Sequence, residues 1–117
     1  MSTSAPSAPT APTAPSAPIT LCRYWVKPDH EPRFREALAQ HWPTFQKLGL
    51  VADEPPHLIF RGEDKERGVF YVETFAWKDA DASHRAHSLP EVGAVWGPMG
   101  ECCSAMEFPS VALIQSP

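Results

Sequence analysis

Four ionisable side chains are the candidates for chemistry: Arg23, Glu73, His84 and His87. His84 and His87 stand three residues apart, so both lie on one face if this segment is helical. A two-histidine metal site needs a third ligand, and the nearby acidic residues are expected to cap a helix instead, so we expect no metal. We expect one histidine to be exposed and the other to reach the rim of a pocket. His87 is then a candidate general base, because an imidazole titrates near neutral pH.

Arg23 and Glu73 fall within two segments that have the composition of neighbouring central strands. If both side chains point to the same side of a sheet, they form a buried ion pair that sets register and assembly. A catalytic role for the pair is the alternative. The chain contains no Gly-rich phosphate loop, no nucleophile elbow and no zinc-ligand spacing.

Composition and charge argue against several classes of function. Residues 1–18 repeat Ser-Ala-Pro and Thr-Ala-Pro and predict a disordered tail, because they have little apolar surface to bury. The remaining residues, 19–117, are long enough for one domain and carry the whole net charge of −4 without a basic stripe. We therefore expect no nucleic-acid partner, and no apolar run is long enough to span a membrane.

The sequence contains three cysteines, Cys22, Cys102 and Cys103, and no secretion signal. This combination predicts reduced thiols and a cytoplasmic location. The adjacent pair is open to a redox or metal interpretation, but we expect all three to act as small buried hydrophobic residues.

Residue patterns predict strands at 19–26, 57–61, 69–77 and about 107–114. A first helix after Asp29 has apolar residues at helical spacing: Phe34, Leu38, Trp42 (or His41), Phe45 and Leu48. Pro43 predicts a kink there or two short helices. In the second helical region, Ser88-Leu89-Pro90-Glu91 matches a capping box that restarts the helix at a new angle. This order predicts an α+β, ferredoxin-like βαββαβ fold, a four-stranded antiparallel sheet with helices on one face.

Both faces of the strand at 69–77 are mostly apolar, so both must be covered. Two helices cover one face, and a second copy of the sheet is the simplest cover for the other. We therefore expect a face-to-face homodimer with Tyr71, Phe75 and Trp77 inside the shared barrel.

The strand Val69-Phe70-Tyr71-Val72-Glu73-Thr74-Phe75-Ala76-Trp77, the helix start Lys78-Asp79-Ala80-Asp81 and the later His87-Ser88-Leu89-Pro90-Glu91-Val92 resemble the antibiotic biosynthesis monooxygenase family. That family belongs to the dimeric α+β-barrel superfamily. The resemblance spans residues 19–114 and implies a homodimer, a pocket between each sheet and its own helices, and catalysis without a cofactor.

Placing Arg23 and Glu73 in the dimer barrel leaves the opposite face as the floor of this pocket: Cys22, Tyr24, Phe70, Val72 and Thr74. The roof comes from both helices: Phe34, Leu38, Trp42, His87 and Trp96. Such a lining suits a flat, aromatic ligand with few polar contacts. Solid packing of the same side chains is the alternative.

Two functions fit these features. In one, the chain is a cofactor-independent monooxygenase for an aromatic or polyketide-like substrate, with His87 removing a proton and Tyr24 donating a hydrogen bond. In the other, it is a non-catalytic ligand-binding or dimerisation module of the same fold.

Overall fold

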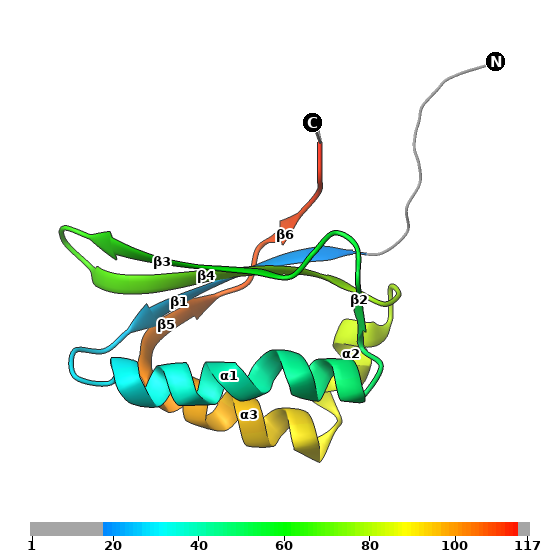
Figure 1. The fold of residues 1–117 in the computed structure, drawn as a ribbon, viewed down its shortest axis with the longest axis horizontal. Coiled ribbons are helices and arrows are strands. Elements are labelled where there is room, and N and C mark those ends of the chain that lie inside the picture. Colours follow the sequence, from blue (N-terminus) through cyan, green and yellow to red (C-terminus); the bar gives the residue numbers. More distant parts are fainter. Residues whose placement is uncertain (1–17, 115–117) are drawn as a thin grey trace.

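The computed structural model of the chain describes residues 18–114 and has the predicted α+β architecture (Figure 1). The predicted tail lies outside the described residues, apart from Pro18, whose carbonyl accepts a hydrogen bond from the Trp77 amide at 2.8 Å. The elements are β1 (Ile19–Val26), α1 (Glu31–Lys47), β2 (Val51–Ala52), β3 (Leu58–Asp64), β4 (Gly68–Trp77), α2 (Ala82–His87), α3 (Pro90–Glu101), β5 (Cys103–Glu107) and β6 (Ser110–Val111).

The sheet has β4 and β1 at its centre, paired antiparallel with Tyr24 opposite Tyr71 and Cys22 opposite Glu73. The short β2 and the longer β3 pair with the outer edge of β4, and β5 and β6 pair with the outer edge of β1. The final strand therefore begins earlier than predicted, at Cys103, and is divided in two. The ferredoxin-like arrangement is confirmed.

All the helices lie on one side of this sheet, and α1 packs beside α3 (Figure 1). Helix α1 runs through Pro43 as one helix, so of the two predicted outcomes, a kink or two short helices, the second is wrong. Its buried positions are Phe34, Leu38, His41 and Phe45. Of the two residues considered for this position, His41 is fully buried, and Trp42 is half-buried beside it against Phe75 of the sheet.

The second helical region restarts at Pro90, as predicted, but by a different device. Leu89 is the N-cap residue of α3 and no side chain caps it. The Ser88 hydroxyl instead donates to the Arg85 carbonyl at 2.8 Å and satisfies the end of α2. The predicted capping box is thus absent, because Ser88 closes the preceding helix. Among the described residues, no helix is long and apolar enough to cross a membrane.

The two faces of the sheet differ from the prediction in one strand. Cys22, Tyr24 and Val26 of β1 point to the helices, as expected. On β4, the residues that join this core are Tyr71, Phe75 and Trp77, with Glu73 buried among them. The expected position of Tyr71, Phe75 and Trp77 in a dimer barrel is therefore wrong.

The cause is the register of β1 with β4. Arg23 lies opposite Val72, and Cys22 lies opposite Glu73. Directly opposed residues share a face, so Arg23 and Glu73 point to opposite sides of the sheet. The predicted pair between them does not form, and Arg23 instead contacts Glu107 at 3.1 Å.

Candidate functional site

A pocket of about 450 Å³ lies between the helix-facing side of the sheet and the α2–α3 region. Its buried end is formed by Cys22, Tyr24, His41 and Phe75. Apolar walls are supplied by Ile19, Trp77, Trp96, Met106 and Phe108, and partly or fully exposed polar residues at its open side are Thr20, Ser83, His87 and Ser110. Within the described part of the chain, none of the lining residues is an acid, a lysine or an arginine. The pocket therefore suits a neutral, largely apolar molecule.

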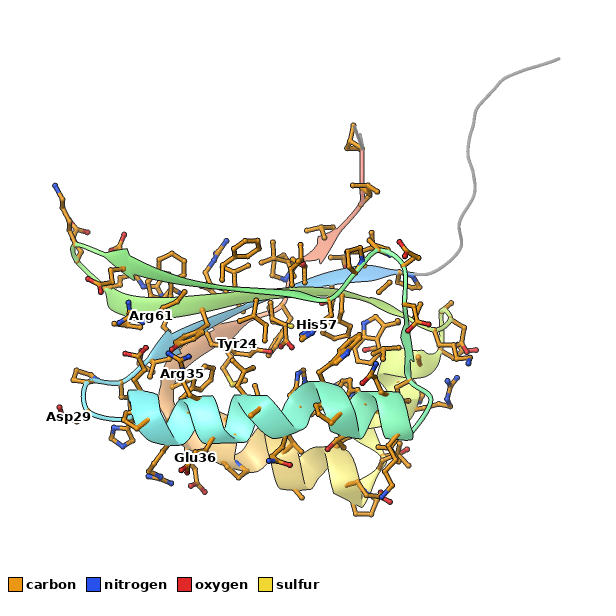
Figure 2. All side chains as sticks on the ribbon, in the orientation of Figure 1. Tyr24, Asp29, Arg35, Glu36, His57 and Arg61 are labelled. Carbon is orange, nitrogen blue, oxygen red and sulfur yellow. The ribbon has the colours of Figure 1, made fainter. Side chains whose placement is uncertain are left out.

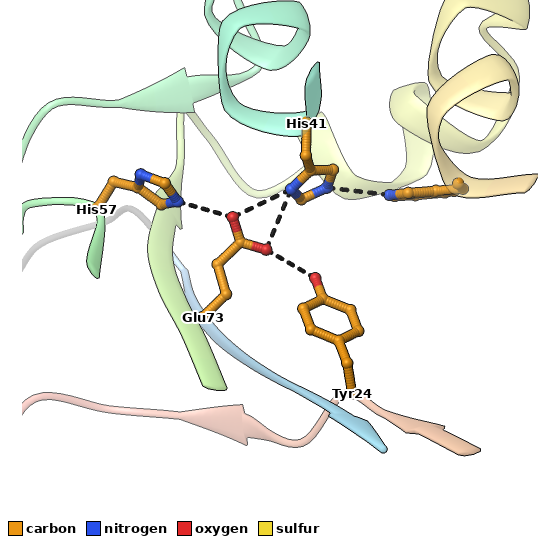
Figure 3. Close-up of polar contacts among 5 residues, drawn as sticks. Tyr24, His41, His57 and Glu73 are labelled. Carbon is orange, nitrogen blue, oxygen red and sulfur yellow. Dashed lines mark hydrogen bonds and ion pairs between the residues drawn. The ribbon is translucent and has the colours of Figure 1, made fainter. Parts of the chain in front are cut away.

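Behind the buried end lies a carboxylate, Glu73, which is itself fully buried. The Tyr24 hydroxyl donates to its Oε1 at 2.7 Å, and His57 Nε2 lies 2.7 Å from its Oε2. Nδ1 of His41 is 3.1 Å from both carboxylate oxygens (Figure 3). Residues from β1, from α1 and from the position just before β3 thus converge on one side chain of β4, and Tyr24 and His57 lie between the sheet and α1 (Figure 2).

These contacts keep Glu73 ionised. Burial alone would raise its pKa, but hydrogen bonds from His41, His57 and Tyr24 outweigh burial and lower the pKa to about 2. An ionised carboxylate only accepts hydrogen bonds. Each of the three neighbours must therefore direct a proton toward Glu73.

The proton position on His41 follows from both of its partners. The Trp96 indole Nε1–H donates to His41 Nε2 at 3.1 Å. An indole nitrogen only donates, so His41 Nε2 must carry the lone pair and Nδ1 the hydrogen. His41 is therefore a neutral imidazole whose Nδ1–H points to Glu73.

Glu73 also fixes the position of the Tyr24 proton. Its pKa is raised by burial first and then by the negative charge of Glu73, so the phenol stays protonated. Its one proton already points to Glu73. The hydroxyl therefore offers lone pairs to a ligand, and the expected role of Tyr24 as hydrogen-bond donor requires this contact to break.

His87 is arranged differently, at the exposed rim. Its Nδ1 lies 2.8 Å from the Ser83 carbonyl oxygen, which only accepts. Nδ1 therefore carries the hydrogen, and a neutral His87 has its lone pair on Nε2. The imidazole also packs edge-on against Trp96, with ring centroids 5.0 Å apart. This geometry leaves Nε2 able to accept a proton from a bound molecule.

Cys22 lines the pocket as an inert thiol. Burial raises its pKa to about 12, so it remains protonated at neutral pH. Cys102 and Cys103 are buried as well, and all three cysteines are free. Among residues 18–114, no group of three or more histidine, cysteine or acidic side chains is arranged to hold a metal ion.

Four of the predicted site residues meet at this pocket: Cys22, Tyr24, His87 and Trp96. Phe34 and Leu38 are buried in the core and do not line the pocket. Trp42 packs beside that core and stacks on His57 instead.

The prediction that Phe70, Val72 and Thr74 of β4 form the pocket floor is wrong. These residues lie on the opposite face of the sheet. Their pairing partners in β1 are Trp25, Arg23 and Leu21, none of which points to the helices. Phe75 and Trp77 take their place in the pocket lining.

Sequence reasoning missed His41 and His57. The signal for His41 was present in the periodicity of α1, because Phe34, Leu38, His41 and Phe45 follow a regular core-facing spacing. His57 precedes β3 and gave no such signal. Only the fold brings it to Glu73.

No protein-family model matches the sequence, and none of the curated proteins does. Solved structures do match. SnoaB, a cofactor-independent oxygenase from Streptomyces nogalater, aligns with a TM-score of 0.66 at 19% identity, over 87% of this chain and 97% of that one. An antibiotic biosynthesis monooxygenase aligns with a TM-score of 0.64 at 10% identity, over 84% and 99%.

A dimeric ferredoxin-like protein of unknown function from Jannaschia sp. aligns with a TM-score of 0.58 at 15% identity, over 83% of this chain and 99% of that one. At these identities the likeness is one of fold. The predicted resemblance to antibiotic biosynthesis monooxygenases is thus confirmed at the level of the fold.

Proposed function

We propose that the chain is a cofactor-independent monooxygenase that acts on an aromatic, phenolic or polyketide-like substrate in the pocket between sheet and helices. One observation carries this proposal: a pocket of about 450 Å³ with apolar walls has at its rim a basic nitrogen, His87 Nε2, for which residues 18–114 supply no hydrogen-bond partner. The fold likeness to a cofactor-independent oxygenase supports the same reaction class.

The chemistry requires little from the protein. His87 Nε2 removes a proton from an acidic O–H or C–H of the substrate, and the resulting electron-rich anion reacts with O₂. For oxidation of a CH₂ group to a carbonyl, one oxygen atom stays on carbon and the other leaves as water with both hydrogens. The substrate's own electrons reduce O₂, so the balance needs no cofactor and no external reductant. The apolar pocket contributes by excluding water from the anion.

The test is binding and turnover with the purified chain alone. Titration with polycyclic phenols should quench tryptophan fluorescence, because Trp77 and Trp96 line the pocket. Oxygen consumption should then follow substrate without added metal, flavin or haem. Binding without oxygen consumption would favour the alternative, a ligand-binding module of the same fold. If such compounds neither bind nor turn over, both the proposed monooxygenase and the ligand-binding alternative are contradicted.

We also propose that two copies pair through the sheet face that the helices leave open. Its apolar residues include Leu58 and Phe60 of β3, 46% and 56% exposed, which pair with Thr74 and Val72 of β4. Phe70 lies on the same face and packs on Trp25, with ring centroids 4.9 Å apart, and Trp25 is itself covered by the Arg67 guanidinium. An apolar surface of this kind favours burial against a partner. The Jannaschia protein of the same fold, itself dimeric, supports a second copy as that partner.

A further inference from the structure

Three donors at the buried end of the pocket, on Trp96, His41 and Tyr24, direct their hydrogens to one another or to Glu73 and not into the pocket. The Trp96 indole donates to His41, His41 donates to Glu73, and Tyr24 donates to Glu73 (Figure 3). Glu73 does not line the pocket, but it is the common end of these contacts. The direction of every proton in this hydrogen-bonded series is fixed, because the Glu73 carboxylate only accepts and the Trp96 indole only donates.

A ligand that reaches this end therefore meets lone pairs. The Tyr24 oxygen retains acceptor capacity, and the other fixed polar group of the pocket, His87 Nε2, is an acceptor too. The hydroxyls of Thr20, Ser83 and Ser110 can each donate or accept, so they set no preference, and that of Thr20 also contacts the Cys22 thiol. The Cys22 thiol is only a weak donor.

We infer that Glu73 is the specificity-determining residue of this pocket: by turning the Tyr24 proton inward, it makes the buried end select ligands that donate a hydrogen bond. A phenol O–H satisfies the Tyr24 oxygen. A ketone or ether oxygen at the same place meets another lone pair and loses its contact with water without replacement. This inference rests on the proposed function and adds to it that the substrate group at the buried end of the pocket is a hydrogen-bond donor.

Tyr24 and Glu73 have different roles in this arrangement: Tyr24 contacts the ligand, and Glu73 orients Tyr24. Glu73 touches no ligand and acts through Tyr24, so it is a positioning residue. A hydroxyl that donates to the neutral Tyr24 oxygen is stabilised in its protonated form, so this contact positions the substrate, and the proton that His87 removes at the rim comes from another part of it.

The experiment uses three naphthalene probes of similar shape: naphthol, its methyl ether and naphthyl methyl ketone. Binding to the full-length chain is measured by isothermal titration calorimetry. We expect the wild type to bind naphthol roughly five- to tenfold more tightly than the ether and the ketone, the scale of one hydrogen bond. The ratio between probes is the readout, because a merely structural change would weaken all three together.

Two variants test the cause. Tyr24→Phe removes the acceptor oxygen and should bring the three affinities within about twofold of one another. Glu73→Gln removes the negative charge and one of the two acceptor oxygens, so the Tyr24 hydroxyl is no longer held toward position 73 and its proton can point into the pocket. The ketone should then gain affinity relative to naphthol. Tyr24→Phe keeps the test decisive if Glu73→Gln fails to fold.

The outcomes separate this inference from the proposed function. Equal binding of all three probes by the wild type overturns the inference and leaves the pocket's ligand class standing. A preference that Tyr24→Phe removes but a folded Glu73→Gln retains also overturns it, because Glu73 would then not set the direction. If none of the three probes binds, both the inference and the proposed function are contradicted.

Discussion

His57 lies face to face on Trp42, with ring centroids 4.1 Å apart and planes within 3° of parallel, while its Nε2 lies 2.7 Å from Glu73. The two contacts connect the start of β3 to α1 and to β4. His57 is the only one of the three partners of Glu73 with a partly exposed side chain, at 16%. It therefore closes the buried carboxylate from solvent at the edge of the sheet.

Replacing His57 with alanine should remove both contacts. We expect the free energy of unfolding to fall by about 1–3 kcal/mol, because Glu73 loses one of its donors while remaining buried. His57→Gln, which can restore a donor but not the stacked ring, should show a smaller loss. His84→Ala, at an exposed histidine of α2, is the control and should change stability by less than about 0.5 kcal/mol. Urea unfolding measures all three, and equal effects at positions 57 and 84 would contradict the role given to His57.

His87 is expected to matter for turnover and little for the fold. It is exposed, so His87→Ala should leave the thermal midpoint almost unchanged. If the imidazole is the general base, turnover of a phenolic substrate should fall roughly 10²-fold or more, while affinity changes less. Ser83 offers only its backbone carbonyl to this contact, so Ser83→Ala is a matched control that keeps the proton position of His87. Unchanged turnover in His87→Ala would remove this residue from the mechanism.

The proposed dimer can be tested with two neighbouring residues of β3. Phe60 pairs with Val72 on the open face of the sheet, whereas Ile59 pairs with Glu73 and faces the helix side. They are 56% and 41% exposed, so a glutamate costs a single chain little at either place. Phe60→Glu should dissociate the dimer, because it buries an unpaired charge in the interface, and Ile59→Glu should not. Light scattering reads the mass, and a monomeric wild type at micromolar concentration would contradict the proposal.

Local signals were sufficient to predict most of the elements. The bounds of β1 were predicted correctly, since β-branched and aromatic residues run from Ile19 to Val26 and Lys27-Pro28 follows. Pro43 misled, because the long apolar face of α1 packs on the sheet and on α3 on both sides of that residue. The strength of tertiary packing at a proline is not visible in a local pattern.

The residues of β4 alone do not show which alternate set faces the helices and which faces the open side of the sheet. Phe70, Val72 and Thr74 on one face and Tyr71, Phe75 and Trp77 on the other are similarly apolar, so hydrophobicity does not distinguish them. Glu73 was assigned to the face of the dimer barrel because it was expected to form a buried ion pair there with Arg23 of the neighbouring strand. The donors that stabilise Glu73 on the helix-facing side, His41, His57 and Tyr24, come from three other segments, and only the completed fold brings them together.

The low pKa of Glu73 also predicts how stability depends on pH. Its pKa is about 2 in the folded chain, below its ordinary value of 4.5, so the unfolded chain binds this proton first as pH falls. The stabilisation is therefore complete above about pH 4.5 and is lost as pH falls toward 2. Glu31 complicates the measurement, because hydrogen bonds from Arg61 and Tyr71 lower its pKa to about 2 as well.

Comparing Glu73→Gln with the wild type isolates the contribution of Glu73. The variant keeps Glu31 but cannot titrate at position 73, so the difference in unfolding free energy between the two proteins should be constant from pH 7 to about pH 5. It should then shrink between about pH 4.5 and pH 2, as the wild type loses its carboxylate. Glu31→Gln is the matched control, because its exposed, solvent-screened site should give a much smaller difference over the same range. Urea unfolding at closely spaced pH values makes the comparison. A difference that stays constant down to pH 2 would mean that the Glu73 carboxylate is not held in its charged form by His41, His57 and Tyr24.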